Sequence, residues 1–439
     1  MSIGAIPRHR PRQILPDPCI SRRTSLSLTD QEILGFGKVA DLANGHAYHD
    51  LPPALLSAIT ELPTLWRDAS RLSPLDWERG YRAAFARLAG LPGLTALRFC
   101  RPCPTASNSI DLVSALLRQQ NRRTLLVQPT FDNLALLLRR RGVAVEPIAE
   151  SVLFDISAHD ALDRILLGQG AAALFLVSPT NPTGRCMDAA TLAALAALCA
   201  RRQILLVIDA CFRLFDRNPI DDLAILQASG VSFLVFEDTG KCFPTLDTKA
   251  SLIYGSDDIA ADLEAIYNEV YLCCSGLSLA FLTRLFELTS AAGLHSTLWS
   301  FVDQRRMRLR AALVGTGLTP APESFHSVIG LEWLDCRPAG MSDVDACESL
   351  GRLGIAAVTG RQFFWADPDA PLHQHRLRLS MMKTRRCFDG GLLLLERLRD
   401  AGGLGALASG NDVAFRATQF SAPAEDDPIR LRAVRSASA

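Results

Sequence analysis

One lysine in this chain has the surroundings of a reactive amine. Of the 46 lysine and arginine residues, only Lys38, Lys241, Lys249 and Lys383 are lysines. Lys241 follows the apolar run 233–236, which predicts a buried strand. A lysine amine can lose its proton and attack a carbonyl carbon, whereas a guanidinium stays charged. Lys241 is therefore either a nucleophile at a strand end or an ordinary loop lysine in solvent.

Two further polar residues follow predicted strands. Asp209 ends the apolar run 204–209, where a buried carboxylate would need a cationic partner such as a pyridinium nitrogen. The alternative is a helix cap at a strand–helix junction. Asn181, in Asn181-Pro-Thr-Gly184, offers an amide donor to a ring oxygen, or forms an ordinary turn.

Three other stretches carry groups that suit an aromatic, anionic ligand. Ser107 and Asn108 precede the helix predicted over 110–118, where small polar side chains and backbone N–H groups cradle phosphate or merely cap the helix. Phe131 can stack on a flat ring or belong to the core. Arg378 can bind a carboxylate with two parallel hydrogen bonds, or face solvent from a strand.

Composition excludes several classes of function. The chain has 439 residues, 49% of them hydrophobic, and a formal net charge of zero, so no nucleic-acid or membrane-surface partner is indicated. Twelve cysteines show no framework of pairs, and Cys100 with Cys103 forms a lone C-x-x-C that is weak support for a metal. Free thiols and the absence of a signal peptide or an apolar span predict a cytoplasmic protein.

From about residue 70, apolar runs alternate with helix-period segments. We expect strands over 124–129, 173–179, 204–209, 233–236 and 250–254, and a helix over 189–200. Continuous apolar strands with helical crossovers predict an α/β fold with a mostly parallel sheet covered on both faces. Ligands of such sheets lie at the carboxyl ends of the strands, where Asn181, Asp209 and Lys241 fall.

The domain organisation is expected to have five parts. Residues 1–24 and 409–439 are predicted to be a disordered arm and tail, with an N-terminal segment (25–69), a large domain (70–290) and a smaller α+β domain (291–408) between them. The N-terminal segment begins with a helix-cap signal at 27–30. In the smaller domain we expect strands over 328–331, 356–358 and 377–379, and a helix over 343–353.

Together these residues, in this order over about 70–405, resemble the fold-type-I pyridoxal-phosphate (PLP) enzymes, the aminotransferase class I and II superfamily. The resemblance implies that PLP joins covalently to Lys241, that Asp209 keeps its ring nitrogen protonated, and that Asn181 binds its ring oxygen. It also implies an amino-acid substrate and a homodimer. The remaining residues are carried over as ligands of the ring, the phosphate and the substrate carboxylate: Phe131, Phe212, Ser107, Asn108, Lys249 and Arg378.

The departures from the aminotransferase pattern are specific. Phe212 stands where a tyrosine is usual, Lys249 where an arginine is usual, and Glu237-Asp-Thr-Gly240 replaces the segment that usually carries a serine. Ser107-Asn108 stands where glycine is common.

These departures resemble a narrower group, the PLP-dependent L-arginine oxidases and hydroxylases of enduracididine-type biosynthesis. The shared features are Asp238-Thr-Gly-Lys241, a helix element with Thr29 and Glu32, and His46. The resemblance implies that an N-terminal segment closes over the site. Asp238, three residues before Lys241, can face a guanidinium that enters there, and His46 and Glu32 are candidates for orienting water. Asn44 stands where the group has aspartate, which weakens the expectation that arginine itself is the substrate.

We therefore expect a natural-product oxidase or hydroxylase that uses dioxygen with PLP and no metal. Its product would be a 2-oxo acid with or without a 4-hydroxyl group. An aminotransferase is the main alternative, followed by a PLP enzyme of elimination or cyclisation and by a non-catalytic PLP-fold regulator.

Overall fold

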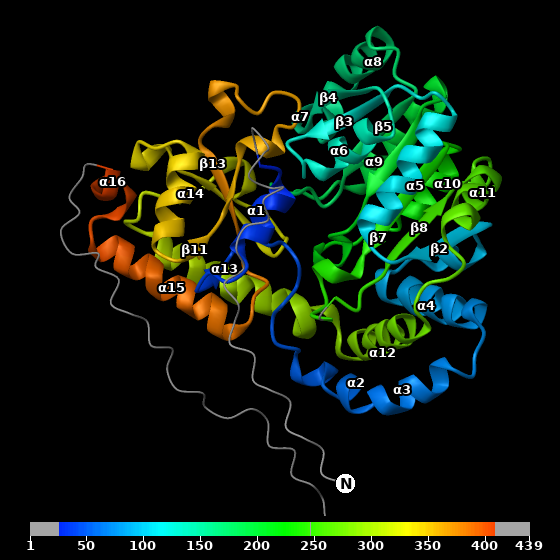
Figure 1. The fold of residues 1–439 in the computed structure, drawn as a ribbon. Coiled ribbons are helices and arrows are strands. Elements are labelled where there is room, and N and C mark those ends of the chain that lie inside the picture. The colour runs from blue at the N-terminus through cyan, green and yellow to red at the C-terminus, as the bar shows by residue number, and fades with distance from the viewer. Residues whose placement is uncertain (1–25, 246, 409–439) are drawn as a thin grey trace, which may run out of the picture.

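A seven-stranded mixed sheet forms the centre of the larger lobe (Figure 1). The computed structural model describes residues 26–408 apart from residue 246, so the expectations for 1–24 and 409–439 lie outside the described residues. The strands stand in the order β2-β8-β7-β6-β5-β3-β4. Their bounds are β2 Phe99–Cys103, β3 Thr124–Gln128, β4 Val145–Ala149, β5 Ala173–Val177, β6 Leu205–Asp209, β7 Phe233–Asp238 and β8 Ser251–Gly255.

The inner strands are buried on both faces. Every residue of β5, β7 and β8 is buried, as their continuous apolar sequences predict for a sheet covered by helices. On this lobe α5 packs against α6 and α11, α9 packs against α10, and α4 packs against α12. The bounds are α4 Pro74–Ala89, α5 Ala106–Gln119, α6 Asn133–Arg140, α7 Glu150–Leu153, α8 His159–Gly168, α9 Ala189–Arg202, α10 Asp222–Ser229, α11 Ala260–Val270 and α12 Gly276–Ala292.

The direction of β8 matters for the site. Strands β5, β6 and β7 run parallel, so the segments that follow them leave the sheet at one edge. Strand β8 is antiparallel to β7 and begins at Ser251, opposite Asp238. Lys249, just before β8, is therefore brought to the same edge as Lys241, just after β7.

The smaller lobe is built on a four-stranded antiparallel sheet in the order β12-β13-β10-β9. Strand β13 and helix α14 confirm the strand and helix expected over 377–379 and 343–353. The bounds are β9 Thr319–Pro320, β10 Leu331–Asp335, β12 Val358–Thr359, β13 Arg376–Ser380, α13 Ser300–Leu313, α14 Asp343–Arg352, α15 Arg385–Asp400 and α16 Gly403–Ala408.

Two strand predictions in this lobe need correction. The strand expected over 328–331 instead runs through β10, because its pairing with β13 begins only at Leu331. The strand expected over 356–358 is split into β11 (Ile355–Ala356) and β12, which belong to different sheets. Ala357 lies at the point where the chain passes from one sheet to the other.

The N-terminal segment connects the two lobes (Figure 1). Ser27 caps helix α1 (Leu28–Gly35) in a capping box with Asp30, as the sequence signal predicts. Strand β1 (Ala40–Asp41) then pairs in parallel with β11 of the smaller lobe. Further along, the Ala47 N–H donates to the Gly240 carbonyl at 2.9 Å, so the segment is also tied to the turn that carries Lys241. Helices α2 (Ser57–Thr60) and α3 (Leu62–Ala69) follow.

Among the described residues no single helix is long and apolar enough to cross a membrane. The pair Gly276–Ala292 and His295–Leu313 meets the length and composition criteria together, with a bend of 105° between its members.

The docking of α1 is expected to depend on pH through Asp132. This buried carboxylate accepts the Leu28 N–H at 3.0 Å through Oδ2, and its Oδ1 is buried without a hydrogen-bond partner. Burial raises the pKa of Asp132 from 3.8 to about 6, with the negative charges of Glu32 and Asp30 acting in the same direction. Docking is therefore expected to be strongest below about pH 4 and to weaken as pH rises through about pH 6.

Asp132→Asn keeps an acceptor for Leu28 and removes the charge. We expect hydrogen-exchange protection of the α1 amides, corrected for intrinsic rates, to fall between pH 4 and 7 in the wild type and to stay level in Asp132→Asn. Asp160→Asn, at an exposed position, is the control and should behave as the wild type. An α1 whose protection rises with pH in the wild type would contradict the assignment.

Candidate active site

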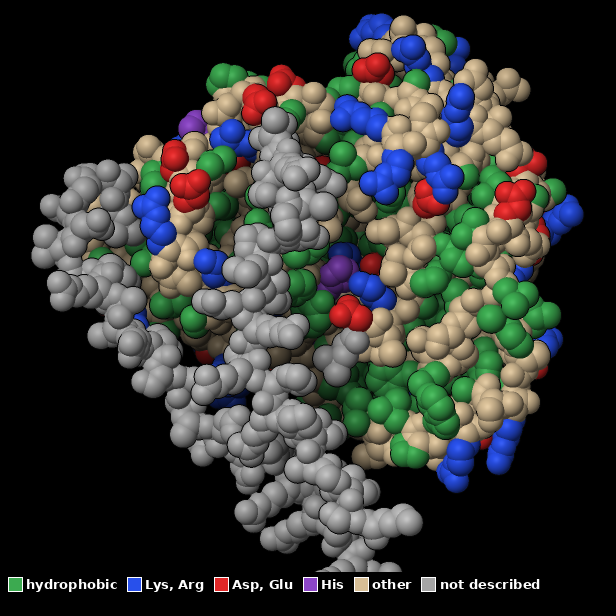
Figure 2. Space-filling view, viewed as in Figure 1, with side chains coloured by type: hydrophobic (Ala, Val, Ile, Leu, Met, Phe, Trp, Pro, Cys, Tyr) green, Lys and Arg blue, Asp and Glu red, His purple; other side chains and the backbone are tan. Residues whose placement is uncertain are grey.

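A cavity between the lobes gathers most of the residues singled out in the sequence. With its opening to solvent it encloses about 840 Å³. Figure 2 shows a hollow there in which histidine, basic and acidic side chains lie together. The predicted residues that line the cavity are Thr29, Glu32, His46, Ser107, Phe131, Asn181, Asp209, Phe212, Asp238, Lys241 and Lys249.

Lys241 ends a short 3-10 turn (Thr239–Lys241) that is held from both sides. The Asp238 carboxylate accepts the Gly240 N–H at 2.8 Å, and the Thr239 hydroxyl donates to the Ala250 carbonyl at 2.9 Å. A Cβ at Gly240 would stand 2.7 Å from Cδ of Lys249, so the close approach of the two lysine segments requires glycine. Within the described part of the chain the Lys241 amine makes no hydrogen bond, which leaves it available to a ligand.

Asp209 is a carboxylate at the cavity wall without an ion pair among the described residues. It is the last residue of β6, and its Oδ1 accepts the Cys211 N–H at 2.9 Å. Burial raises the pKa of Asp209 to about 6, although this hydrogen bond and the charge of Lys241 lower it. A ligand cation beside this carboxylate would offset the loss of hydration.

His46 links the N-terminal segment to Lys249. Its Nε2 lies 3.0 Å from Nζ of Lys249, and its Nδ1 lies 2.9 Å from Oδ1 of Asn44. The positive charge of Lys241, burial, and the charges of Lys249, Lys383 and Arg378 hold the pKa of His46 well below its ordinary value. His46 is therefore a neutral ring at the cavity wall.

Arg378 lies behind the cavity wall and not on a solvent-facing strand. Its side chain on β13 is 1% exposed, and its Nη2 donates to Glu32 Oε1 at 2.7 Å and to the Ala43 carbonyl at 2.9 Å. Its Nη1 lies 3.4 Å from Oδ1 of Asn181, and its Nε is buried without a partner. Glu32 of α1 thus places a carboxylate on the guanidinium that was expected to bind the carboxylate of a substrate.

The helix behind the expected phosphate loop starts earlier than predicted. Thr105 caps α5 at Ala106, so Ser107 and Asn108 lie in its first turn and not before it. Ser107 lines the cavity and accepts from Asn133 Nδ2 at 3.3 Å, whereas Oδ1 of Asn108 accepts from the Thr105 hydroxyl at 2.7 Å. The Thr130 hydroxyl, which also faces the cavity, is buried without a partner.

Three predicted residues stand apart from the cavity lining. Asn108 serves the helix cap, Arg378 lies behind Glu32, and Asn44 points to His46. Their contacts with cofactor or substrate stay predictions.

Thr130 lines the cavity but was not predicted to belong to the site, because an isolated threonine carries no sequence signal that separates it from a turn residue.

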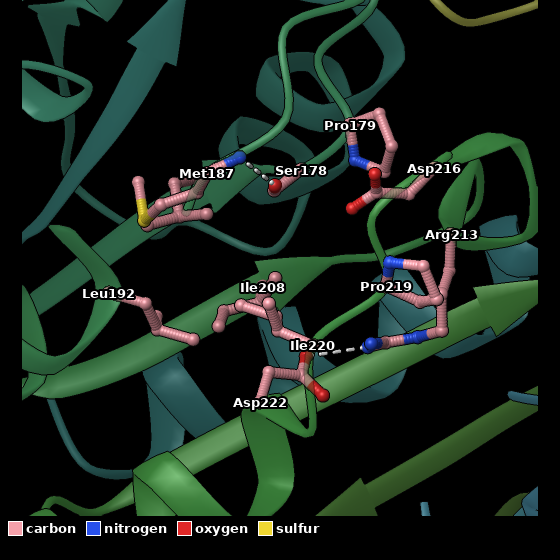
Figure 3. A pocket seen from close by; sticks show the side chains of 11 residues that line it. Ser178, Pro179, Met187, Leu192, Ile208, Arg213, Asp216, Pro219, Ile220 and Asp222 are labelled. Carbon is pink, nitrogen blue, oxygen red and sulfur yellow. Dashed lines mark hydrogen bonds and ion pairs between the residues drawn. The ribbon is translucent and has the colours of Figure 1, made fainter. Parts of the chain in front are cut away.

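A network of ion pairs and hydrogen bonds lies at the end of β7, next to the turn that carries Lys241. Arg213, next to Phe212, donates to Glu237 at 2.7 Å and to Asp222 at 2.7 Å, and Tyr254 donates to Glu237 at 3.1 Å. Glu237 immediately precedes Asp238, so the network fixes the end of β7. A second, smaller hollow lies along this network, lined by Ser178, Met187 and Ile220 among others (Figure 3).

In the part of the chain that the structure describes, no three histidine, cysteine or acidic residues are grouped to hold a metal ion. Cys100 and Cys103 both lie buried on β2.

Residues 39–387 match the model of the family "aminotransferase class I and II". The chain belongs to this family. It is 24% identical over 310 residues to a probable N-succinyldiaminopimelate aminotransferase of Mycobacterium tuberculosis, with 67% of this chain and 76% of that protein covered. It is 25% identical over 266 residues to a threonine-phosphate decarboxylase of Sinorhizobium sp, with 61% of this chain and 70% of that protein covered.

Solved structures agree with this assignment. The structure of MppP soaked with its product 2-ketoarginine matches with a TM-score of 0.73 and 31% identity, over 81% of this chain and 99% of that chain. Aspartate aminotransferase from Thermus thermophilus with maleate matches with a TM-score of 0.65 and 18% identity, over 84% of this chain and 94% of that chain. The chain is thus a PLP-dependent enzyme of fold type I.

The cavity fits PLP by the chemistry of its donors. Among the described residues, Lys241 provides an amine free of internal hydrogen bonds, Asp209 a half-buried carboxylate without an ion pair, and Thr130 an unpaired hydroxyl. The residues that would hold the aldehyde, the ring and the phosphate are Lys241, Asp209, Asn181, Phe131, Phe212, Ser107, Lys249 and the first turn of α5. Phe212 brings no hydroxyl, so Asn181 would be the polar partner for a ring oxygen.

Proposed function

We propose that this enzyme oxidises L-arginine, or a similar cationic amino acid, with dioxygen. The observation that carries the proposal is the position of Asp238. Its carboxylate lines the cavity three residues before Lys241, and among the described residues it forms no ion pair. A cationic side chain entering beside Lys241 would supply the missing charge. The similarity to MppP, solved with 2-ketoarginine, supports the same class of substrate.

The proposed overall reaction balances without another redox partner. One amino acid, one dioxygen and one water give a 2-oxo acid, ammonia and hydrogen peroxide. A second oxidation by dioxygen, with a second water, would place a hydroxyl group at C4 and release a second peroxide. PLP supplies the electron sink when it is bound.

The residues of this chain have distinct tasks in the proposal. The Lys241 amine removes the α-proton, and Asp209 holds a positive charge on the ring nitrogen. Arg378 binds the substrate carboxylate in exchange for Glu32, with which it pairs in this structure. His46, a neutral ring at the cavity wall, helps to orient water there. The N-terminal segment, which carries Glu32 and Thr29, excludes bulk water while it covers the site.

Oxygen consumption tests the proposal directly. We expect purified, PLP-loaded enzyme to consume dioxygen with L-arginine and to form peroxide, ammonia and a 2-oxo acid, resolved by mass spectrometry. L-lysine, L-homoarginine and L-norleucine complete the panel of cationic and neutral side chains. If no cationic amino acid drives oxygen uptake, the oxidase proposal fails.

Asp238→Asn separates charge recognition from turnover. Because the amide still accepts the Gly240 N–H, the Lys241 turn should keep its shape while kcat/KM for L-arginine falls about 10- to 100-fold, the effect of losing one charged hydrogen bond. The value for L-norleucine should change little. An equal loss for both substrates would assign Asp238 to the turn alone.

An aminotransferase is the second candidate, because curated relatives of this chain carry that name. Such an enzyme would need a 2-oxo acid as acceptor and no oxygen. Formation of glutamate from 2-oxoglutarate under nitrogen would support it, and its absence together with oxygen uptake would reject it.

We further propose a homodimer in the cytoplasm. Exposed apolar side chains support a second copy as partner, with Trp66 68% exposed and Leu272 94% exposed. Eleven free cysteines in the described residues suit a reducing compartment. Light scattering measures the mass of the assembly, and a monomer at working concentration would contradict the dimer.

A further inference from the structure

Asn44 makes its side-chain contacts with His46, although its sequence position suggested a contact with substrate. Asn44 is 5% exposed and is not one of the cavity-lining residues, whereas His46 is. One oxygen of the amide, Oδ1, lies 2.8 Å from the backbone N of His46 and 2.9 Å from its Nδ1. The Asn44 side chain therefore contacts both the backbone and the ring of His46.

The hydrogen on the His46 ring follows from these neighbours. A backbone N–H can only donate, so the amide atom facing it must be the oxygen, and Nδ1 beside that oxygen must carry the hydrogen. On the other side of the ring, a lysine ammonium has hydrogens and no lone pair, so Nε2 must accept from Lys249. Two independent contacts thus indicate the same tautomer.

The surrounding charges favour a ring without a second proton. Lys241 and Lys249 line the cavity with His46, and Lys383 and Arg378 also act on it. Of the acidic groups nearby, Glu32 pairs with Arg378 and Asp41 pairs with Lys383 at 3.4 Å, whereas Asp209 and Asp238 line the same cavity without an ion pair among the described residues. An amide at position 44 adds no negative charge that would stabilise an imidazolium.

We propose that Asn44 is a positioning residue, which holds His46 with its hydrogen on Nδ1 and a lone pair on Nε2. The functional consequence rests on the proposed function. A neutral ring with this tautomer has no hydrogen on Nε2, so it cannot donate a proton there, and its Nε2 lone pair accepts from Lys249. His46 would then act as a neutral hydrogen-bonding group and not as an acid, and Asn44 would influence the reaction without touching substrate.

NMR of the PLP-loaded enzyme with ¹⁵N-labelled histidine measures the tautomer without turnover. The chain has eight histidines, so His46→Gln identifies the signal of His46. We expect one Nδ1–H form for His46 that is neutral from pH 6 to 9. An Nε2–H form or a titrating imidazolium in this range would overturn the proposal.

Two variants then separate Asn44 from Lys249. In Lys249→Met the ammonium is gone, and we expect Asn44 alone to keep the hydrogen on Nδ1. Adding Asn44→Leu, which preserves bulk and removes the acceptor, should convert the signal into a mixture of tautomers. Adding Asn133→Leu instead is the matched control, because Asn133 lines the same cavity and bonds Ser107, and it should leave the His46 signal unchanged.

Each result decides the role of Asn44. Loss of the Nδ1–H form already in Lys249→Met would assign the tautomer to Lys249, and its survival in the double variant would also exclude Asn44. Circular dichroism and thermal unfolding establish that each variant is folded, and Asn44→Ser replaces Asn44→Leu where the latter unfolds. Because the spectra need no substrate, absence of oxygen uptake would refute the proposed function and leave this inference standing.

Discussion

Lys241→Ala is expected to lose covalent PLP and to lower kcat/KM by about 10³-fold or more. The amine serves both as the nucleophile toward the aldehyde and as the group that moves the α-proton, and no other lysine in the cavity has its position at the end of β7. Lys241→Arg should be as inactive, because a guanidinium keeps the charge and cannot attack. The measurement is the rate of product formation together with the mass of the protein after borohydride reduction.

Tryptic mapping gives this prediction a sharp readout. Trypsin cleaves after Arg217, Lys241 and Lys249, and a modified Lys241 blocks the second of these cuts. Reduced wild-type enzyme should yield the peptide 218–249 with the mass of the cofactor added. Lys38→Ala, at an exposed position, is the control and should keep both activity and modified peptide. Recovery of unmodified 218–241 from active, reduced wild type would exclude Lys241.

The sequence predicted the inner sheet because burial on both faces leaves a visible pattern. Strands β3, β5, β6, β7 and β8 are nearly continuous apolar runs, and polar residues at or after the ends of the parallel strands mark the ligand edge. The two edge strands, β2 and β4, were not predicted. Each contains a proline, Pro102 or Pro147, which is tolerated where only one neighbour pairs with the strand but hides the strand in the sequence.

The site was predictable where one residue type serves one chemical need. Lys241, Asp209 and Asn181 each stand at a strand end, and they meet because β5, β6 and β7 are adjacent and parallel. The order of those strands in the sheet cannot be predicted from any single segment of the sequence.

Contacts between side chains far apart in the sequence could not be predicted from the sequence. Glu32 and Arg378 are 346 residues apart, and their 2.7 Å contact depends on β1 joining β11 and on Leu28 docking against Asp132. Asn44 was assigned to substrate because it stands where the resembled group has aspartate, but only the turn of the backbone directs its oxygen to His46.

Arg378→Met is expected to lower the free energy of unfolding by about 3–5 kcal/mol. The substitution leaves the Glu32 carboxylate, 6% exposed, without its cationic partner, and an unpaired buried charge is far more unfavourable than the pair itself. Its remaining partner among the described residues is the Gly45 N–H at 3.1 Å. Denaturant unfolding of PLP-loaded enzyme at pH 7.5 measures the loss.

A second substitution should restore stability without restoring activity. Glu32→Gln removes the charge, so Glu32→Gln/Arg378→Met should recover most of the lost free energy of unfolding, while KM for the amino acid stays raised because the guanidinium is still absent. Arg352→Met, which breaks an exposed pair with Glu348, is the matched control and should change stability by less than about 1 kcal/mol. Full recovery of KM in the double variant would mean that Arg378 serves only to neutralise Glu32. A double variant no more stable than Arg378→Met would show that Arg378 stabilises the fold through its packing and not through its charge interaction with Glu32.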